Sequence, residues 1–265
     1  MIVHNFDPVL VDLYLIKIRW YSLAYIFGIL GGWWYGKFLI KLQVQSQDQK
    51  NYLHSFDDLI GYIIIGIILG GRLGYVIFYN PIFYLNNFLE VFKIWNGGMS
   101  FHGGLIGVMF SAYIFSIKNK LNFKIFFDTI STVSPIGIFF GRISNFINSE
   151  LYGIPTDKPW GVIFPKVDKL SRHPSQIYEA LLEGVVLFLL LNYLLRKKMF
   201  PHGIVSSVFL IFYGLFRIIS ENFREPDEHL GYIFLNLSMG SMLSIMMIIF
   251  GFLIFYKILV YDKNK

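Results

Sequence analysis

The chain has 265 residues, of which 55% are hydrophobic, 19% aromatic and only 15% charged, and its mean hydropathy is +0.56. An ordinary globular domain carries about 25% charged residues, so this composition excludes a soluble protein and predicts one that crosses a membrane several times. The net charge of +6 does not indicate nucleic-acid binding, because no basic patch alternates with aromatic side chains.

Seven apolar segments reach the length of about 17 to 25 residues that a helix needs to cross a bilayer. The N-terminal MIVHNFDPVL lacks the basic and apolar regions of a cleaved signal peptide, so we expect the first span to be the targeting signal as well. The expected spans are residues 20–39, 59–78, 101–117, 126–147, 176–195, 203–219 and 234–256. The third, with its glycine-rich entry, is also compatible with a re-entrant turn. We predict an all-α integral membrane protein, with residues 1–265 in a single polytopic domain.

Basic residues concentrate in alternate connectors, and this distribution predicts the orientation. They are Lys37, Lys41 and Lys50; Lys118, Lys120 and Lys124; Arg196, Lys197 and Lys198; and Lys257, Lys263 and Lys265. Since connectors rich in Lys and Arg stay in the cytoplasm, we expect the N-terminus outside and the C-terminus inside. The outer connectors are then about residues 80–100, 148–175 and 220–233, and the polar second one is long enough to form a small cap over the helices.

Glycines recur four residues apart in three of the expected spans. They are Gly66, Gly70 and Gly74; Gly103 and Gly107; and Gly137 and Gly141. Small residues at this spacing let two membrane helices approach closely, so we interpret most of them as packing positions.

Polar stripes occupy the outer ends of two spans. Arg142, Asn145 and Ser149 fall at i, i+3 and i+7, and Glu150 follows directly. In the sixth span Arg217, Glu221 and Arg224 fall at i, i+4 and i+7. An arginine near a helix end often extends to the lipid headgroups, but that reading does not account for the amide and carboxylate one turn away. Ionisable groups at membrane depth usually face the interior of the bundle and mark function.

Other polar residues are expected at the same depth. His102 lies in NGGMSFHGGLIG at the start of the third span, Tyr21 begins the first, and Arg72 lies in the outer half of the second. Glu179 and Glu183, one turn apart, are expected to counter Arg72 or Arg142, or to form structural ion pairs. Gly103 and Gly104 beside the histidine would let a ligand or another helix come close.

The residue types predict an anionic phospholipid as ligand. The planar guanidinium matches phosphate oxygens and stays charged at any working pH. His102 has an ordinary pKa of about 6.5 and could move a proton. The absence of cysteine excludes disulfides and thiolate metal sites. The histidines His4, His54, His202 and His229 show no metal-ligand spacing, and there is no P-loop and no hydrolase or zinc-protease motif. We expect no metal and no cofactor.

With these residues in view, the chain closely resembles the bacterial prolipoprotein diacylglyceryl transferases over nearly its whole length. The resemblance rests on HGGLIG (102–107), GRISNFINSELYG (141–153), RHPSQIYEALLEG (172–184), FRIISENFREPDEHLG (216–231) and RWYSLAY near the start. Ser144 stands where that family usually has Gly or Ala.

The resemblance implies a seven-helix enzyme of the bacterial inner membrane with its active site toward the outer face. It implies transfer of the diacylglyceryl group of phosphatidylglycerol to the lipobox cysteine of a prolipoprotein signal peptide, with glycerol 1-phosphate released and no metal required. Carried over by motif, His102, Arg217 and Tyr21 are catalytic, and the residues that bind phosphatidylglycerol are Arg142, Asn145, Glu150, Gly153, Glu221 and Arg224. As hypotheses, His102 accepts the thiol proton, Arg142 and Asn145 hold the headgroup, and Glu221 orients Arg217.

Two other functions remain alternatives. Outer arginines between helices could line the path of an anion or lipid transporter, although no inverted repeat is apparent. A membrane protein that only binds lipid is the second.

Overall fold

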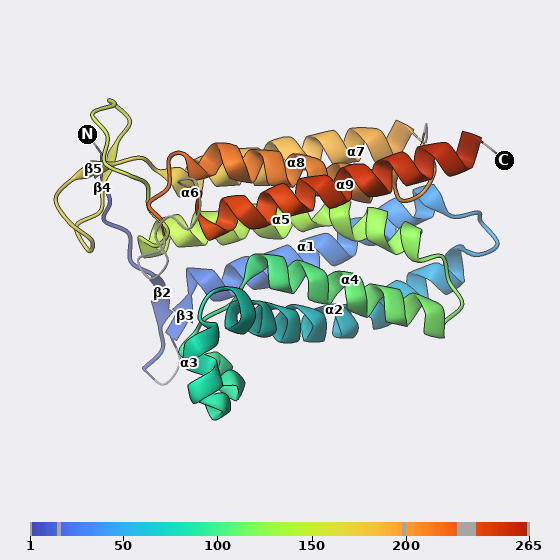
Figure 1. Cartoon of the computed structure of the whole chain (residues 1–265), viewed down its shortest axis with the longest axis horizontal. Helices are drawn as coiled ribbons and strands as arrows, with labels where there is room; N and C mark the ends of the chain where they lie inside the picture. Colours follow the sequence, from blue (N-terminus) through green and yellow to red (C-terminus); the bar gives the residue numbers. More distant parts are fainter. Residues whose placement is uncertain (1, 15–16, 198–199, 227–236, 264–265) are drawn as a thin grey trace. The chain divides into compact units, whose positions relative to one another are not determined.

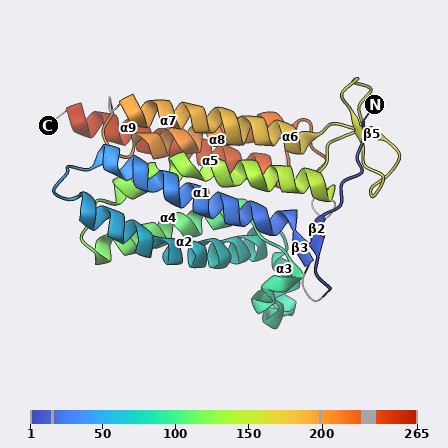
Figure 2. The same ribbon diagram turned by 180° about the vertical axis from the view of Figure 1, so that it is seen from behind.

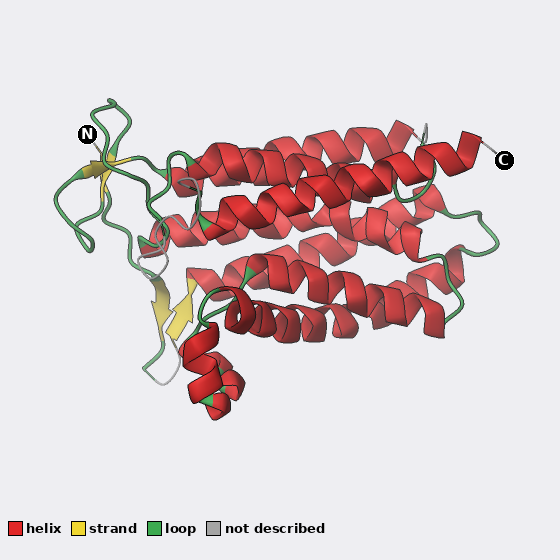
Figure 3. Cartoon of the chain, in the orientation of Figure 1, coloured by secondary structure: helices red, strands yellow, loops and turns green. Residues whose placement is uncertain are grey.

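The computed structural model describes residues 2–14, 17–197, 200–226 and 237–263. Within these residues seven helical segments are long and apolar enough to cross a membrane, which agrees with the predicted number (Figures 1 and 3). They are α1 (Trp20–Gln43), α2 (Gln49–Phe78), α4 (Phe101–Lys118), α5 (Phe123–Asn148), the segment Ser175–Lys197 that contains α6 (Ser175–Glu179) and α7 (Leu187–Lys197), α8 (Ile204–Glu221) and α9 (Met239–Lys263).

The predicted spans differ from the helices mainly at their ends. The third span is one continuous helix from Phe101 to Lys118, so the re-entrant alternative is wrong. Helix α2 begins ten residues before its predicted span, because a polar segment with a buried Phe56 extends the helix. The first residues of the last predicted span, 234–236, lie outside the described residues, and α9 begins at Met239.

The described residues form two compact units, each treated by itself below. Unit 1 contains residues 1–36 and 130–265, and unit 2 contains residues 37–129. Helices α1 and α5 contribute residues to both units. The single polytopic domain stays a prediction.

In unit 2, helices α2 and α4 pack against each other through glycines, as the four-residue spacing predicted. A Cβ on Gly70 would lie 2.8 Å from the Cα of Gly107, and one on Gly74 would meet Gly103 at 2.6 Å. These contacts are backbone to backbone, so no side chain could move aside. Close approach of this kind replaces hydrophobic burial as the force that associates helices in lipid.

In unit 1, α7, α8 and α9 lie side by side with the C-terminal part of α5 (Figure 2). Helix α8 is the central element, because most of its side chains are buried, Tyr213 and Phe209 almost completely. Buried Leu187 and Leu191 of α7 complete the apolar core. On α5, Gly137 comes close to Gly28 of α1, whereas Gly141 has open space.

The connector between α5 and α6 folds into the small cap that its length predicted. Strands β1 (Ile2–Val3), β4 (Val162–Ile163) and β5 (Ser171–Arg172) form a sheet of order β1-β4-β5, in which β1 is parallel and β5 antiparallel to β4. The strands lie at the end of the unit 1 helices where α6 begins (Figure 1). An antiparallel pair, β2 (Val9–Asp12) and β3 (Lys17–Arg19), precedes α1 directly. In unit 2 the segment after α2 forms the short α3 (Pro81–Asn86).

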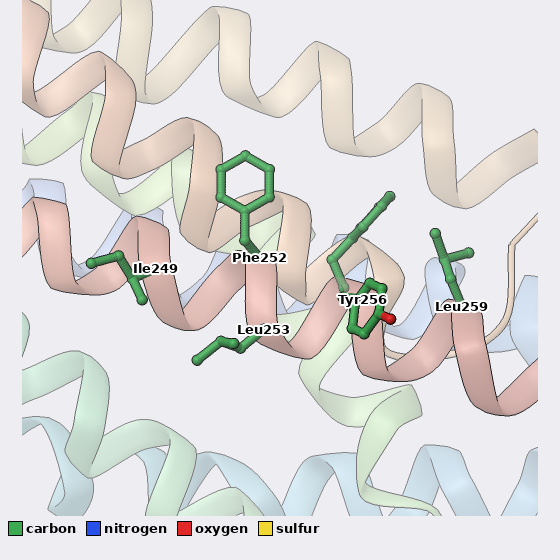
Figure 4. A pocket seen from close by; sticks show the side chains of 6 residues that line it. Ile249, Phe252, Leu253, Tyr256 and Leu259 are labelled. Atoms are coloured by element: carbon green, nitrogen blue, oxygen red, sulfur yellow. The ribbon is translucent and has the colours of Figure 1, made fainter.

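Part of the exposed surface of α9 is apolar. A shallow hollow on it is lined by Ile249, Phe252, Leu253, Tyr256 and Leu259, whose side chains Figure 4 shows on this helix. Most of them are more than half exposed, which is expected where a helix faces lipid tails. The hollow contains none of the predicted site residues.

Candidate active site

Six ionisable side chains of unit 1 meet in one buried cluster, which we call the arginine–glutamate cluster. Its members are Arg142 of α5, Glu179 of α6, Glu183 of the following turn, Arg217 and Glu221 of α8, and Arg224 just beyond α8. Four of them were predicted as functional residues, and the structure brings these four together.

Glu179 is the centre of this cluster. Its carboxylate oxygens lie 2.9 Å from Arg142 Nη1, 2.9 Å from Arg217 Nη1 and 3.4 Å from Arg224 Nη1. Glu183 contacts Arg142 at 3.1 Å and Arg217 at 3.7 Å. Both carboxylates are fully buried, and a buried charge is tolerated only when it is paired. Three arginines face three glutamates, so the cluster as described is formally neutral.

The local helix geometry presents both glutamates to the arginines. Residues Ala180–Val186 form a π-helical stretch between α6 and α7. Such stretches are rare and occur often at functional sites, because the wider turn changes the direction of the side chains. Gly184 in this stretch lies against Phe139 of α5, where a Cβ would come within 2.8 Å of the Phe139 Cβ. The close approach brings Glu183 within reach of Arg142.

The polar stripe on α8 is only partly helical. The helix ends at Glu221, which pairs with Arg217 at 2.9 Å and accepts a hydrogen bond from Ser238 at 2.8 Å. Arg224 lies outside the helix, where its backbone forms a β-bridge with Gly153. Its side chain nevertheless reaches Glu179, so Arg217 and Arg224 meet at one carboxylate although the predicted helical register does not extend to Arg224.

Close contacts explain why residue 153, one of the predicted site residues, is a glycine. A Cβ at this position would lie 2.5 Å from the carbonyl oxygen of Phe223, 2.7 Å from the Cβ of His173, and closer still to the His173 carbonyl oxygen. The backbone at Gly153 passes between the segments that lead into α6 and out of α8. Only a glycine fits there, and the segment that carries Arg224 depends on it.

Asn145 and Glu150 pair at the end of α5. The Asn145 amide donates to one carboxylate oxygen of Glu150 at 3.1 Å, and Asn148 donates to the other at 3.2 Å. Asn145 is buried, whereas Glu150 is exposed. Ser149, predicted on the same helical stripe, lies beyond the helix and contacts His4 Nδ1 at 3.2 Å.

Two further positions lie near this end of unit 1. Tyr21 is in the first turn of α1, with its ring centroid 5.3 Å from that of Tyr25. Ser144, the departure from the family pattern, is buried and donates a hydrogen bond to the carbonyl of Trp20 at 3.3 Å. The hydroxyl is therefore accommodated by an acceptor on α1.

Arg72, in unit 2, donates to backbone carbonyl groups, and within the part of the chain that the structure describes it pairs with no carboxylate. Its guanidinium donates to the carbonyl oxygens of five residues in the segment after α3: Glu90, Val91, Lys93, Gly97 and Gly98, at 2.5 to 3.3 Å. It also lies over the ring of Tyr84, 5.0 Å from its centroid. Of the two candidate partners proposed for Glu179 and Glu183, the structure therefore pairs them with Arg142.

His102 lies in unit 2, buried in the first turn of α4. Ser100 caps this helix, with its hydroxyl accepting from Gly103 N at 3.2 Å. Gly97 and Gly98, with φ of +81° and +78°, supply the backbone path into the turn. The neighbour of Gly103 is helix α2, so of the two readings of this glycine, close helix packing is the one observed.

The sequence interpretation missed Arg172, which organises the cap. Its guanidinium bonds to Asp168 at 2.6 Å, to Glu225 at 2.9 Å and to the carbonyl of Gly153 at 3.0 Å. The hydrogen bond from Arg172 holds the pKa of the Asp168 carboxyl below its usual value. Arg172 opens the block RHPSQ, and its place beside a predicted site segment was the available signal.

Known proteins match this chain over nearly its whole length. A family model described as prolipoprotein diacylglyceryl transferase matches residues 8–257. Relatives named phosphatidylglycerol–prolipoprotein diacylglyceryl transferase include proteins of Rickettsia bellii, 48% identical over 96% of this chain and 95% of the relative, and Rickettsia typhi, 48% identical over 95% and 96%. One from Rhodospirillum rubrum is 48% identical over 94% of this chain and 91% of its own length. Family model and relatives both span nearly the whole chain, and this chain therefore belongs to the prolipoprotein diacylglyceryl transferase family.

Proposed function

We propose that this protein transfers the diacylglyceryl group of phosphatidylglycerol to the thiol of a lipobox cysteine in a prolipoprotein. A carbon–sulfur bond forms at the terminal glyceryl carbon, the carbon–oxygen bond to phosphate breaks, and glycerol 1-phosphate leaves with the electron pair. The observation that carries the proposal is the arginine–glutamate cluster, in a chain whose family performs this transfer by name.

The cluster suits the charge change of this reaction. The lipid phosphodiester has one negative charge, and the departing phosphate monoester has nearly two. Donors fixed in advance, where water is excluded, stabilise growing charge without reorganisation. We assign this role to Arg217 and Arg142, with Arg224 beside them; Glu179 and Glu221 hold the guanidinium planes.

Glu150 and Asn145 have a different role in the proposal. A carboxylate repels phosphate but accepts hydrogen bonds from hydroxyl groups. The exposed Glu150, oriented by Asn145 and Asn148, suits the free hydroxyls of the headgroup glycerol. This contact would distinguish phosphatidylglycerol from a phospholipid without them. We propose that Tyr21, in the first turn of α1, takes part in catalysis at the end of unit 1 where Glu150 lies.

His102 is proposed as the base that accepts the thiol proton. A thiol has an ordinary pKa near 8.5 and attacks as thiolate, so an acceptor is useful at neutral pH. Replacing His102 by Gln removes the acceptor and keeps the size. We expect the transfer rate to fall about a hundredfold or more. Retention of most of the rate would remove the base role and leave thiolate stabilisation to an arginine.

The experiment uses purified protein in detergent micelles, phosphatidylglycerol labelled in its acyl chains, and a synthetic lipobox peptide. Thioether peptide and glycerol 1-phosphate should form in equal amounts, and a peptide with serine for cysteine should give neither. Arg217→Gln should abolish the product. The matched control is Arg196→Gln, because Arg196 is hydrogen-bonded to Tyr35 and Asn192 away from the cluster. No thioether from the unaltered protein would refute the proposal.

An anion transporter is supported less well. The described core of unit 1 from the cluster toward the start of α8 is largely apolar: Leu187, Leu191, Val205, Val208, Phe209 and Leu210. The buried hydroxyls of Ser207 and Ser244 in this region donate to backbone carbonyls of their own helices. A path for a charged solute would need polar groups along its length. Reconstituted vesicles that release phosphate or glycerol 1-phosphate without peptide would favour this alternative.

We also propose that the protein lies in the bacterial inner membrane, with the cap and the cluster toward the outer face. The basic connectors support this orientation. The chain has no cysteine, so a single one can be introduced at Lys158 of the cap or at Gln47 between α1 and α2, both exposed. In intact cells stripped of the outer membrane, an impermeant maleimide should label Lys158→Cys and leave Gln47→Cys unlabelled. The opposite pattern would invert the orientation.

A further inference from the structure

The turn that carries Glu150 is built from unfavourable backbone conformations. Helix α5 ends with bonds from Glu150 N to the carbonyl of Asn145 at 2.9 Å and from Ser149 N to that of Phe146 at 3.0 Å. This pattern places Ser149 in the left-handed conformation that glycine normally supplies. Both Ser149 and Leu151, on either side of Glu150, have positive φ, +60° and +55°. Such residues persist only where surrounding groups fix them.

Two polar side chains at the start of α6 fix this turn. Gln176 Nε2 donates to the carbonyl oxygen of Glu150 at 2.6 Å, and Ser175 Oγ donates to that of Leu151 at 2.9 Å. Both side chains are completely buried. Consecutive carbonyls of the strained turn are thus held by consecutive residues of one helix. These two hydrogen bonds restrict the backbone on both sides of the Glu150–Leu151 peptide bond.

The same helix also holds the arginines. Gln176 is three residues before Glu179, about one helical turn. Glu179 contacts Arg142, which lies one turn before Asn145 on α5. Helix α6 therefore fixes both the guanidinium of Arg142 and the carboxylate-bearing turn that follows it. The distance between the phosphate-binding and glycerol-binding groups depends on this helix.

We propose that Gln176 and Ser175 are positioning residues for Glu150, and that they set the affinity of the enzyme for the phosphatidylglycerol headgroup without touching it. The inference rests on the proposed role of Glu150. Neither residue is charged, and neither was among the predicted site residues. Their effect on the reaction passes through the orientation of one carboxylate, so it should appear in KM for phosphatidylglycerol and hardly in kcat.

The test is a double-mutant cycle on the full-length protein with dioleoylphosphatidylglycerol in mixed micelles and a saturating lipobox peptide. Gln176→Met removes the donor and keeps the length of the side chain. We expect it to raise KM for the lipid about tenfold, the effect of removing the hydrogen bond that holds the Glu150 carbonyl, with kcat within about twofold. In a Glu150→Gln background the same change should raise KM less than about twofold, because coupled residues are not additive.

The outcomes separate the inference from the proposal beneath it. If Glu150→Gln leaves KM unchanged, the proposed role of Glu150 is wrong. If Glu150→Gln raises KM but the effects of the two changes multiply, or Gln176→Met leaves KM unchanged, only the positioning role fails. Gln43→Met is the matched control, since Gln43 also donates its amide to a backbone carbonyl on a helix, that of Leu39 in unit 2, and should leave KM unaltered.

Ser175 gives a second measurement if Gln176→Met does not fold. Ser175→Ala removes one hydroxyl and leaves a small, buried side chain. It should raise KM several-fold, again only when Glu150 is present, and Ser175→Thr should restore the value because the hydroxyl returns. Equal KM values for Ser175→Ala and the unaltered protein would overturn the proposal for this residue, and a rise that persists in the Glu150→Gln background would indicate a merely structural role.

Discussion

Replacing Glu179 by Gln tests whether the arginine–glutamate cluster is held by charge balance. The change keeps the shape of the side chain and removes one negative charge from a set of three arginines and three glutamates. The described cluster would then carry a net positive charge in a region that excludes water. Glu179 is the residue to change, because it alone contacts all three arginines.

The magnitude follows from the contacts. At an effective dielectric constant of 20, two charges about 4 Å apart attract by about 4 kcal/mol. Most of this is offset by desolvation, and removing one partner of a buried pair usually costs about 3 to 5 kcal/mol. We expect Glu179→Gln to fall in that range. Glu183→Gln should cost less, because Glu183 contacts two arginines, one of them at 3.7 Å.

The assay is thermal unfolding of the purified protein in detergent. For a chain of this size, about 3 to 5 kcal/mol corresponds to a lowering of Tm of roughly 6 to 20 °C. The double variant Glu179→Gln, Arg224→Gln should lose less than the two single changes together, since it restores neutrality. An unchanged Tm for Glu179→Gln, or a larger loss for Glu183→Gln, would refute the charge-balance argument.

Three further changes have expected outcomes. Burial lowers the pKa of His4 below its ordinary 6.5, so the unfolded chain is protonated first and the free energy of unfolding should decrease as the pH falls through 6.5. In melting curves from pH 8 to 5, Tm should depend less on pH in His4→Gln than in the unaltered protein; equal dependence would show that His4 does not contribute to the pH dependence of stability. Gly153→Ala should lose transfer activity and at least about 1 to 3 kcal/mol of stability, because its Cβ meets backbone. Gly141→Ala, where the Cβ enters open space, should keep the stability and activity of the unaltered protein; a stable, active Gly153→Ala would contradict the steric argument. Gly70→Ala should lower Tm by separating α2 from α4, and Gly61→Ala on the same helix should not; similar Tm values for both would show that the close approach is unimportant.

The helices were predictable because their signal is local. A run of about twenty apolar residues forms a membrane helix in almost any context, so the number of spans required no knowledge of packing. Their ends depend on contacts, and there the prediction was less accurate. The polar start of α2 gave no hydropathy signal although Phe56 is buried in its unit. The end of α8 at Glu221 depends on the bridge between Arg224 and Gly153, which lies 71 residues away in the sequence.

The charged residues of the site were predictable by type, and the Arg217–Glu221 pair also by its i, i+4 spacing. The partners that Glu179 and Glu183 have on other helices were not fixed by the sequence. Arginine and glutamate at membrane depth stand out in any sequence. Which glutamate contacts which arginine depends on how α5, α6 and α8 pack, and Arg72 shows the limit. In the sequence it resembles Arg142, an arginine within an apolar span, yet its guanidinium donates hydrogen bonds to five backbone carbonyl oxygens. Ser175 and Gln176 belong to the block RHPSQ, but as neutral residues they were not marked by their chemistry, because their importance lies in two carbonyl groups of another segment.

The neutral cluster also bears on how the proposed reaction discriminates between ground state and transition state. With Glu179 and Glu183 in place, an arriving phosphodiester competes with carboxylates for the same guanidinium groups, so it gains little from binding. The leaving phosphate carries more charge and competes better. An interaction accelerates a reaction only to the extent that it is stronger in the transition state. Under the proposed function, the buried glutamates would therefore do more than neutralise the arginines. They would weaken the ground-state contact with the lipid phosphate and leave the larger part of the arginine interaction for the step in which the carbon–oxygen bond breaks.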